Sequence, residues 1–325
     1  MSLPEFKLLR PRTLAEAVDG LGKHAAVQIV AGGTDLIPSL KQRLFSPAYV
    51  LDIRRIAELR GIRHVPGQGT EIGALTTLTE IEHSDHIRRE YAVLHEAAKT
   101  VASPILRNMG TLGGNICLDT RCLWYNQSLA WRTSCSFCIK KDGDLCHVAP
   151  GGSKCWAVFS GDTPPALLCL EAELEIAGPA GTSRLALRDF YTNVGDARMR
   201  LAKNEIVTRV FLPECTAGYR GVYRKLRLRG SIDYPLAGVA VALKRSNGHI
   251  EAARLAITAV NPAPLLVSGV EKELVGSRVN EDNAAAVGEL AARTAKPLTT
   301  SALTPEYRRE MIRVFAKRAV LEAGR

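Results

Sequence analysis

Long apolar runs are missing from this sequence. The longest, residues 237–243, is far shorter than the roughly 20 residues that a helix needs to cross a bilayer. The first residues also lack the basic start and apolar stretch that a secretory signal peptide requires. We therefore expect a cytoplasmic protein without a membrane span.

Aromatic residues are sparse, at 6% of 325 residues, although the formal net charge is +10. Positive charge can attract nucleic acid, an anionic ligand or an acidic protein. No array of base-stacking aromatic residues accompanies the arginines, so we expect no nucleic-acid partner. The densest basic segment, residues 220–229, alternates like a strand with one solvated face. A docking surface for an acidic electron donor is the alternative.

The chain is too long for one small core, and its patterns predict two or three packed subdomains. Thr13 is placed to cap an amphipathic helix, which an apolar strand follows up to Val30. Mixed helix and strand patterns continue to about residue 216, with a strand expected at 71–78 and a helical stretch at 79–91. Strands and hairpins are expected at 218–260, and helices at 280–325.

Six of the eight cysteines gather in one weakly periodic segment, residues 117–159, which we interpret as an insertion. Cysteines crowded into one loop of a cytosolic protein are typical of metal ligands rather than disulfides. Four thiolates can complete a zinc site or a cubane iron–sulfur cluster. Only Cys135 and Cys138 form a C-x2-C pair, so spacing leaves both metals open and does not say which four cysteines bind.

Two glycine turns stand out, at residues 31–35 and 110–115. Clustered backbone amides at such turns can hold a pyrophosphate without basic side chains, although glycines also occur at turns for steric reasons alone. Two such turns in one chain indicate a dinucleotide. Neither is G-x-G-x-x-G, so the nicotinamide-type fingerprint is absent.

The stretches IVAGGTDLIPSL at 29–40 and MGTLGGNIC at 109–117 resemble the FAD-binding subunits of the xanthine dehydrogenase family. The resemblance covers nearly the whole chain, including residues 160–170 and 223–243. It implies an α+β protein with the two-subdomain FAD-binding fold of the vanillyl-alcohol oxidase type. The implied units are FAD subdomain 1 at 1–55, FAD subdomain 2 at 56–216 with the insertion at 117–159, and a CO-dehydrogenase-flavoprotein-like C-terminal domain at 217–325.

The same resemblance implies the residues that bind FAD. They are Ile29, Val30, Ala31, Gly32, Gly33, Thr34, Asp35 and Leu36 in the first turn, Thr111, Leu112, Gly113, Gly114 and Asn115 in the second, and Asp162 and Lys225. For Asp162 a simple turn role is the alternative, and for Lys225 a solvated strand face. No catalytic residue is expected, because substrate chemistry would occur on a partner subunit.

The insertion resembles that of the β subunits of 4-hydroxybenzoyl-CoA reductases, which hold an additional [4Fe-4S] cluster. Residues 119–122, 125–128, 137–138, 146–147 and 154–155 match that pattern in order and spacing. The resemblance implies four metal ligands, namely Cys122, Cys138, Cys146 and Cys155, with Cys117 and Cys135 as non-ligands and Cys169 and Cys215 as buried thiols.

This resemblance implies an electron-transfer subunit of a molybdenum-dependent 4-hydroxybenzoyl-CoA reductase. Electrons would pass from a ferredoxin-like donor through the cluster and FAD to [2Fe-2S] clusters on a small subunit and molybdenum cofactor on a large subunit. The assembly would be a dimer of heterotrimers. One alternative is the FAD subunit of a related molybdenum hydroxylase or dehydrogenase that oxidises another aromatic, purine or CoA substrate. A non-enzymatic scaffold with a zinc-bound docking loop is a second alternative.

Overall fold

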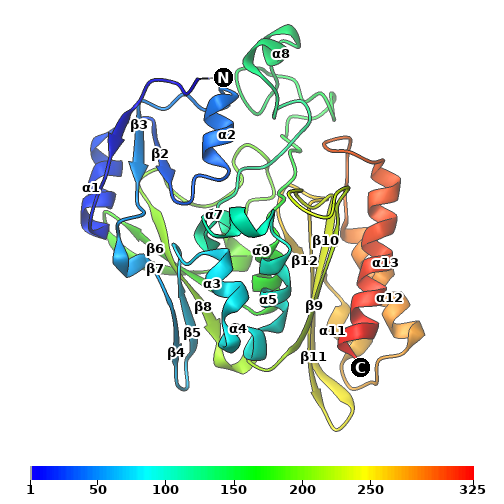
Figure 1. The fold of residues 1–325 in the computed structure, drawn as a ribbon. Coiled ribbons are helices and arrows are strands. Elements are labelled where there is room, and N and C mark those ends of the chain that lie inside the picture. The colour runs from blue at the N-terminus through cyan, green and yellow to red at the C-terminus, as the bar shows by residue number, and fades with distance from the viewer. Residues whose placement is uncertain (1) are drawn as a thin grey trace.

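The structure is a computed structural model that describes residues 2–325. Three sheets organise the chain, and they appear from left to right in Figure 1. The first is a small parallel sheet with the strand order β1-β3-β2. Its elements are β1 (Lys7–Leu9), α1 (Leu14–Lys23), β2 (Val27–Val30), α2 (Leu36–Lys41) and β3 (Tyr49–Asp52). The expected cap is confirmed, since Thr13 Oγ1 accepts a hydrogen bond from the Glu16 amide at 3.2 Å.

The second sheet is antiparallel and has five strands in the order β4-β5-β8-β6-β7. Its strands are β4 (Ile62–Val65), β5 (Gly69–Gly73), β6 (Glu173–Gly178), β7 (Gly181–Ala186) and β8 (Ile206–Pro213). The helices of this region are α3 (Leu78–His83), α4 (Asp85–Glu90), α5 (Ala92–Lys99), α6 (Pro104–Arg107), α7 (Leu112–Ile116), α9 (Thr163–Cys169) and α10 (Leu187–Phe190), with short 3-10 turns η1 (Ala57–Leu59) and η2 (Glu214–Thr216).

The third sheet is also antiparallel, with the order β12-β11-β10-β9. Its elements are β9 (Arg220–Leu226), β10 (Ala237–Ser246), β11 (His249–Thr258), β12 (Leu265–Leu266), α11 (Val270–Leu274), α12 (Glu281–Thr294) and α13 (Pro305–Ala323). Helices α12 and α13 cover its outer face, while α5 and α9 lie between this sheet and the five-stranded one (Figure 1). One core therefore joins the second and third sheets through α5 and α9, and a separate core lies beneath α12 and α13.

The insertion contains one short helix, α8 (Leu129–Ser134), and otherwise follows an irregular path beside α2 (Figure 1). It has its own small core, in which Leu44 packs with Tyr125, Ala157 and three of the cysteines. A long irregular segment usually needs a bound group to order it.

Two sequence predictions need correction. The helical stretch expected at 79–91 divides into α3 and α4, because the Ser84 hydroxyl accepts a hydrogen bond from the Ile87 amide and begins a new helix. The strand expected at 71–78 ends at Gly73, where the chain turns toward α3. In residues 2–325 we find no helix with the length and apolar character needed to span a membrane.

Candidate functional site

A cavity of about 880 Å³ lies where the two glycine turns meet. This volume is within the range of about 300–1,000 Å³ that is usual for small-molecule sites. Residues from the 198–207 segment and the loop between β9 and β10 complete its wall. Twelve of the predicted cofactor residues line it: Ile29, Ala31, Gly32, Gly33, Thr34, Asp35, Leu36, Thr111, Gly113, Gly114, Asn115 and Asp162.

Three predicted residues do not line the cavity. The side chains of Val30 and Leu112 are buried in the protein, and Leu112 belongs to the main core. Apolar side chains next to a glycine turn anchor the backbone, so their contribution to the site is structural. Lys225 reaches the cavity wall only through Asp162.

The first turn connects β2 to α2, and glycine is required there for two reasons. A Cβ atom on Gly32 would lie 1.8 Å from the carbonyl oxygen of Met109, so no larger residue fits without moving backbone. Gly33 has a φ of +74°, which lies in the left-handed region that favours glycine. The two turns therefore touch, and the contact at Gly32 fixes their spacing.

The second turn opens α7 and is held from both sides. Thr111 Oγ1 accepts a hydrogen bond from the Gly114 amide at 3.1 Å. Gly113 packs so closely on Ala74 that an added Cβ would lie 2.8 Å from the Ala74 Cβ. Asn115 Oδ1 accepts hydrogen bonds from the Thr163 amide at 3.0 Å and the Thr163 hydroxyl at 2.7 Å. These bonds connect the second turn to the start of α9.

Asp162 and Lys225 form a buried ion pair, with a distance of 2.9 Å between Nζ and Oδ2 and side chains that are each 3% exposed. The Tyr223 hydroxyl donates to Asp162 Oδ1 at 2.7 Å, and Lys225 Nζ also donates to the Thr100 carbonyl oxygen at 3.0 Å. Burial raises the pKa of Asp162, while the charge of Lys225 opposes that rise. A solvated strand face is therefore the wrong interpretation for Lys225, because β9 packs against α5.

Three residues from distant segments, among them the predicted Asp35, meet at the wall of the larger cavity. Asp35 Oδ1 accepts hydrogen bonds from Arg121 Nη1 at 2.8 Å and from the Tyr234 hydroxyl at 2.7 Å. The Arg121 guanidinium lies over the Tyr234 ring, 4.2 Å from its centroid. Sequence reasoning included Asp35 but missed Arg121 and Tyr234. No local pattern could have found them, since the contacts span 86 and 199 residues.

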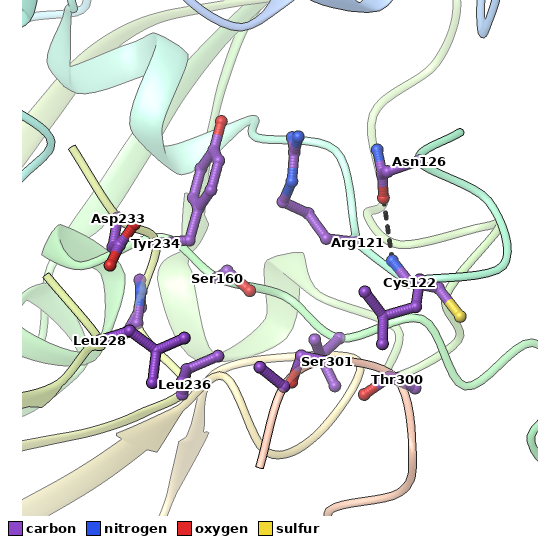
Figure 2. A pocket seen from close by; sticks show the side chains of 14 residues that line it. Arg121, Cys122, Asn126, Ser160, Leu228, Asp233, Tyr234, Leu236, Thr300 and Ser301 are labelled. Carbon is purple, nitrogen blue, oxygen red and sulfur yellow. Dashed lines mark hydrogen bonds between the residues drawn. The ribbon is translucent and has the colours of Figure 1, made fainter. Parts of the chain in front are cut away.

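A second, smaller cavity of about 230 Å³ adjoins the first and is mostly apolar. Arg121 and Tyr234 lie side by side at its edge and line both cavities (Figure 2). Cys122 lines it as well, with its amide donating to Asn126 Oδ1 at 2.9 Å and its sulfur pointing away from the cavity (Figure 2). The insertion therefore adjoins the larger cavity through residues 117–119 and through Arg121, which directly precedes Cys122.

The cysteines of the insertion fall into two classes. All four predicted ligands, Cys122, Cys138, Cys146 and Cys155, are buried, and we refer to them as the four-cysteine group. Three of them pack in one small core with Tyr125. Burial, with a smaller contribution from Cys138 and Cys146, raises the pKa of Cys122 to about 11. The Cys122 thiol is therefore protonated at neutral pH unless a positive centre binds it.

The other cysteines are distributed differently. Cys135 is partly exposed and Cys117 lines the larger cavity, while Cys169 is buried and donates to the Ala240 carbonyl oxygen at 3.4 Å. The prediction of a buried Cys215 is wrong, because the residue lies in η2 at the surface. Among residues 2–325, no three His, Cys, Asp or Glu side chains converge closely enough to hold a single metal ion.

Comparisons with known proteins identify the family. Residues 4–215 match the family described as "FAD binding domain in molybdopterin dehydrogenase", and residues 221–323 match the "CO dehydrogenase flavoprotein C-terminal domain". The chain is 30% identical to the glyceraldehyde dehydrogenase medium chain of Sulfolobus acidocaldarius, covering 99% of each chain. It is 31% identical to the carbon monoxide dehydrogenase medium chain of Afipia carboxidovorans, covering 98% of this chain and 96% of the relative.

A solved structure agrees with these matches. A chain of the Cu,Mo-CO dehydrogenase, in its cyanide-inactivated form, superposes with a TM-score of 0.83 at 28% identity, covering 100% of this chain and 99% of that one. The expected mixed helix and sheet architecture, with an FAD-binding domain followed by a CO-dehydrogenase-type C-terminal domain, is thereby confirmed. The chain belongs to the family of FAD-binding medium subunits of molybdenum-containing dehydrogenases, together with those of CO dehydrogenase and xanthine dehydrogenase.

Proposed function

We propose that this chain is the FAD and [4Fe-4S] electron-transfer subunit of a molybdenum-dependent 4-hydroxybenzoyl-CoA reductase. The observation that carries the proposal is the burial of the four-cysteine group within an insertion that adjoins the large cavity through Arg121. Reductive removal of a phenolic hydroxyl needs electrons of low potential, delivered one at a time. An additional cluster beside the flavin site suits that direction of flow.

The residues of the large cavity fit FAD. Two glycine turns in contact leave backbone amides and no side-chain bulk at Gly32 and Gly113, as a pyrophosphate site requires. We assign the turns to the pyrophosphate, and Asp162, which Lys225 holds in place, to the wall nearer the C-terminal domain. FAD, when bound, exchanges electrons in pairs or singly, and the protein contributes its placement and electrostatic surroundings.

The four-cysteine group fits an iron–sulfur cluster by its donor chemistry. Soft thiolates are the usual ligands of such clusters, and all four candidates are shielded from solvent. A cubane cluster separates its thiolates more widely than a single ion does, so convergence on one point is not required. When bound, the cluster would accept and release one electron. We also propose the two-subdomain arrangement of the vanillyl-alcohol oxidase type, with boundaries near residues 55 and 216.

The proposed partners are a large subunit with molybdenum cofactor and a small subunit with [2Fe-2S] clusters, in a dimer of heterotrimers served by a ferredoxin-like donor. Relatives that are themselves medium chains support the subunit role. A second candidate function is a related hydroxylase or dehydrogenase that oxidises another substrate. It is favoured by relatives named for glyceraldehyde and carbon monoxide.

The first experiment measures iron, acid-labile sulfide, zinc and flavin in the anaerobically purified complex. About four irons with matching sulfide beyond the [2Fe-2S] content, and one FAD, are expected. Cys122→Ser should lose the additional cluster, whereas Cys135→Ser, a partly exposed cysteine of the same insertion, should keep it. Zinc without the additional sulfide, or equal iron loss in both variants, would contradict the cluster assignment.

The second experiment separates the two candidate functions. The purified complex is supplied with 4-hydroxybenzoyl-CoA and a reduced dye of low potential, and formation of benzoyl-CoA is followed. In parallel, aldehydes, purines and carbon monoxide are supplied with an oxidised dye. Turnover in the oxidative assays alone would refute the reductase proposal and support the hydroxylase or dehydrogenase alternative.

A further inference from the structure

Arg132 is a buried arginine without a matching negative charge. It lies in α8 and is 2% exposed. Its Nη2 donates to the Arg43 carbonyl oxygen at 2.7 Å, but Nε and Nη1 are buried and have no hydrogen-bond partner. No carboxylate within residues 2–325 bonds to this guanidinium. Burying a charge without compensation is costly, so this arrangement indicates that a negatively charged group belongs nearby.

A second fully buried arginine, Arg308, shows how this fold can supply every nitrogen of a buried guanidinium with a hydrogen-bond acceptor. Arg308 is 0% exposed. Its three nitrogens donate to the carbonyl oxygens of Leu236, Leu298 and Ala259 at 2.8, 2.9 and 2.6 Å. Arg132, in contrast, makes only one hydrogen bond to a carbonyl oxygen, through Nη2. The fold can satisfy a buried guanidinium with carbonyl oxygens, but at the position of Arg132 in the insertion it leaves Nε and Nη1 without partners.

The surroundings of Arg132 are those of the four-cysteine group. Its guanidinium lies 5.9 Å from the Phe137 ring centroid, and Phe137 directly precedes Cys138. The Phe137 carbonyl oxygen is 2.6 Å from Nε2 of His147, which follows another cysteine of the group. Tyr125 packs with three of the cysteines.

Lys140 is another cation of this region with a buried side chain, and unlike Arg132 it has a carboxylate partner. Its Nζ donates to Asp119 Oδ1 at 2.9 Å, and it also bonds to Thr120 and to the Gly195 carbonyl oxygen. Arg132 is therefore a fully buried cation beside the four-cysteine group that has no carboxylate partner and leaves two of its nitrogens without a hydrogen bond.

We propose that Arg132 balances the negative charge of the cluster held by the four-cysteine group and raises its reduction potential. The inference rests on the proposed function, because it requires a [4Fe-4S] cluster at that group. Sulfides and thiolates together carry more negative charge than the irons carry positive charge, and one-electron reduction adds a further negative charge. A buried guanidinium stabilises the reduced form more than the oxidised form. Arg132 is a positioning residue that acts through the cluster and touches no substrate.

The test measures iron, sulfide and the midpoint potential of the additional cluster by EPR-monitored redox titration of the purified complex. In Arg132→Met the equilibrium constant for reduction should fall roughly tenfold, equivalent to a potential about 59 mV more negative. Arg132→Lys keeps the charge and should recover most of the shift. Arg89→Met removes an exposed charge from α4, at the opposite end of the molecule from α8, and should leave the potential unchanged (Figure 1).

The outcomes separate the two proposals. A wild-type complex without the additional iron and sulfide would refute the proposed function itself. Arg132→Met with a full cluster at the wild-type potential would overturn only the role of Arg132, as would an equal shift in Arg132→Lys.

If Arg132→Met does not fold, pulsed EPR of the reduced wild-type complex, grown with guanidino-¹⁵N arginine, provides a second test. A ¹⁵N coupling that disappears in Arg132→Lys is expected. Identical spectra for the two proteins would overturn the inference.

Discussion

Gly32→Ala tests whether contact between the two glycine turns creates the flavin site. The added Cβ would lie 1.8 Å from the Met109 carbonyl oxygen and 2.5 Å from the Met109 carbonyl carbon, so both contacts are with backbone. No rotamer change can relieve them, and the turns must separate. Overpacking of this kind typically costs about 1–3 kcal/mol. If this cost reduces the free energy of FAD binding, FAD affinity should fall by about 5- to 150-fold, since about 1.4 kcal/mol corresponds to a tenfold change in affinity.

The assay removes flavin from the purified complex and titrates FAD back, following the quenching of flavin fluorescence. Gly22→Ala is the matched control, because an added Cβ at this exposed position in α1 meets nothing within 4 Å. That variant should bind FAD like the wild type and be slightly more stable, since alanine favours helix over glycine by up to about 1 kcal/mol. Wild-type FAD affinity in Gly32→Ala would refute the reasoning that this contact shapes the site.

Two further predictions concern buried carboxylates. Lys225→Met should lower the free energy of unfolding by about 3–5 kcal/mol in urea titrations, because Asp162 is left buried and unpaired. Adding Asp162→Asn should recover much of that loss. If the two substitutions instead changed the free energy of unfolding additively, the proposed pairing would be contradicted. Arg54 bonds to Asp52 at 2.8 and 2.7 Å, and this pairing lowers the pKa of Asp52 below its usual value of 3.8. A lowered folded pKa gives stability that is present above the unfolded pKa and lost as the pH falls through the folded pKa. Asp52→Asn should therefore destabilise at pH 7, with the difference from wild type shrinking toward pH 3, and a constant difference would contradict this linkage.

Arg121 lines both the small cavity in Figure 2 and the larger cavity beside it, which gives it a structural role that the family comparison alone does not describe. Arg121 belongs to the insertion, yet it bonds to Asp35 of the first glycine turn and stacks on Tyr234 of the C-terminal domain. The insertion is therefore anchored to the first glycine turn and to the C-terminal domain at the wall of the larger cavity.

Local features of the sequence determined much of the architecture. The Thr13 cap, the helical periodicity after it and the left-handed turn at Gly33 act over a few residues, so their consequences could be read directly from the chain. The concentration of cysteines in residues 117–159 likewise marked the insertion, and the predicted ligands are its four buried cysteines. The motifs also gave the family, which the comparisons confirm.

Tertiary structure decided what depends on distant partners. Asp162 and Lys225 are 63 residues apart, and Arg121 meets Asp35 across 86 residues, so neither pairing leaves a local pattern. The basic pattern of residues 220–229 suggested a wet face for Lys225 because periodicity reports alternation and not what covers each face. Exposure of Cys215 and the unpartnered nitrogens of Arg132 follow in the same way from how separate segments pack. The sequence determines which polar and ionisable side chains are available. Long-range packing determines which of them are buried away from solvent and which come into contact.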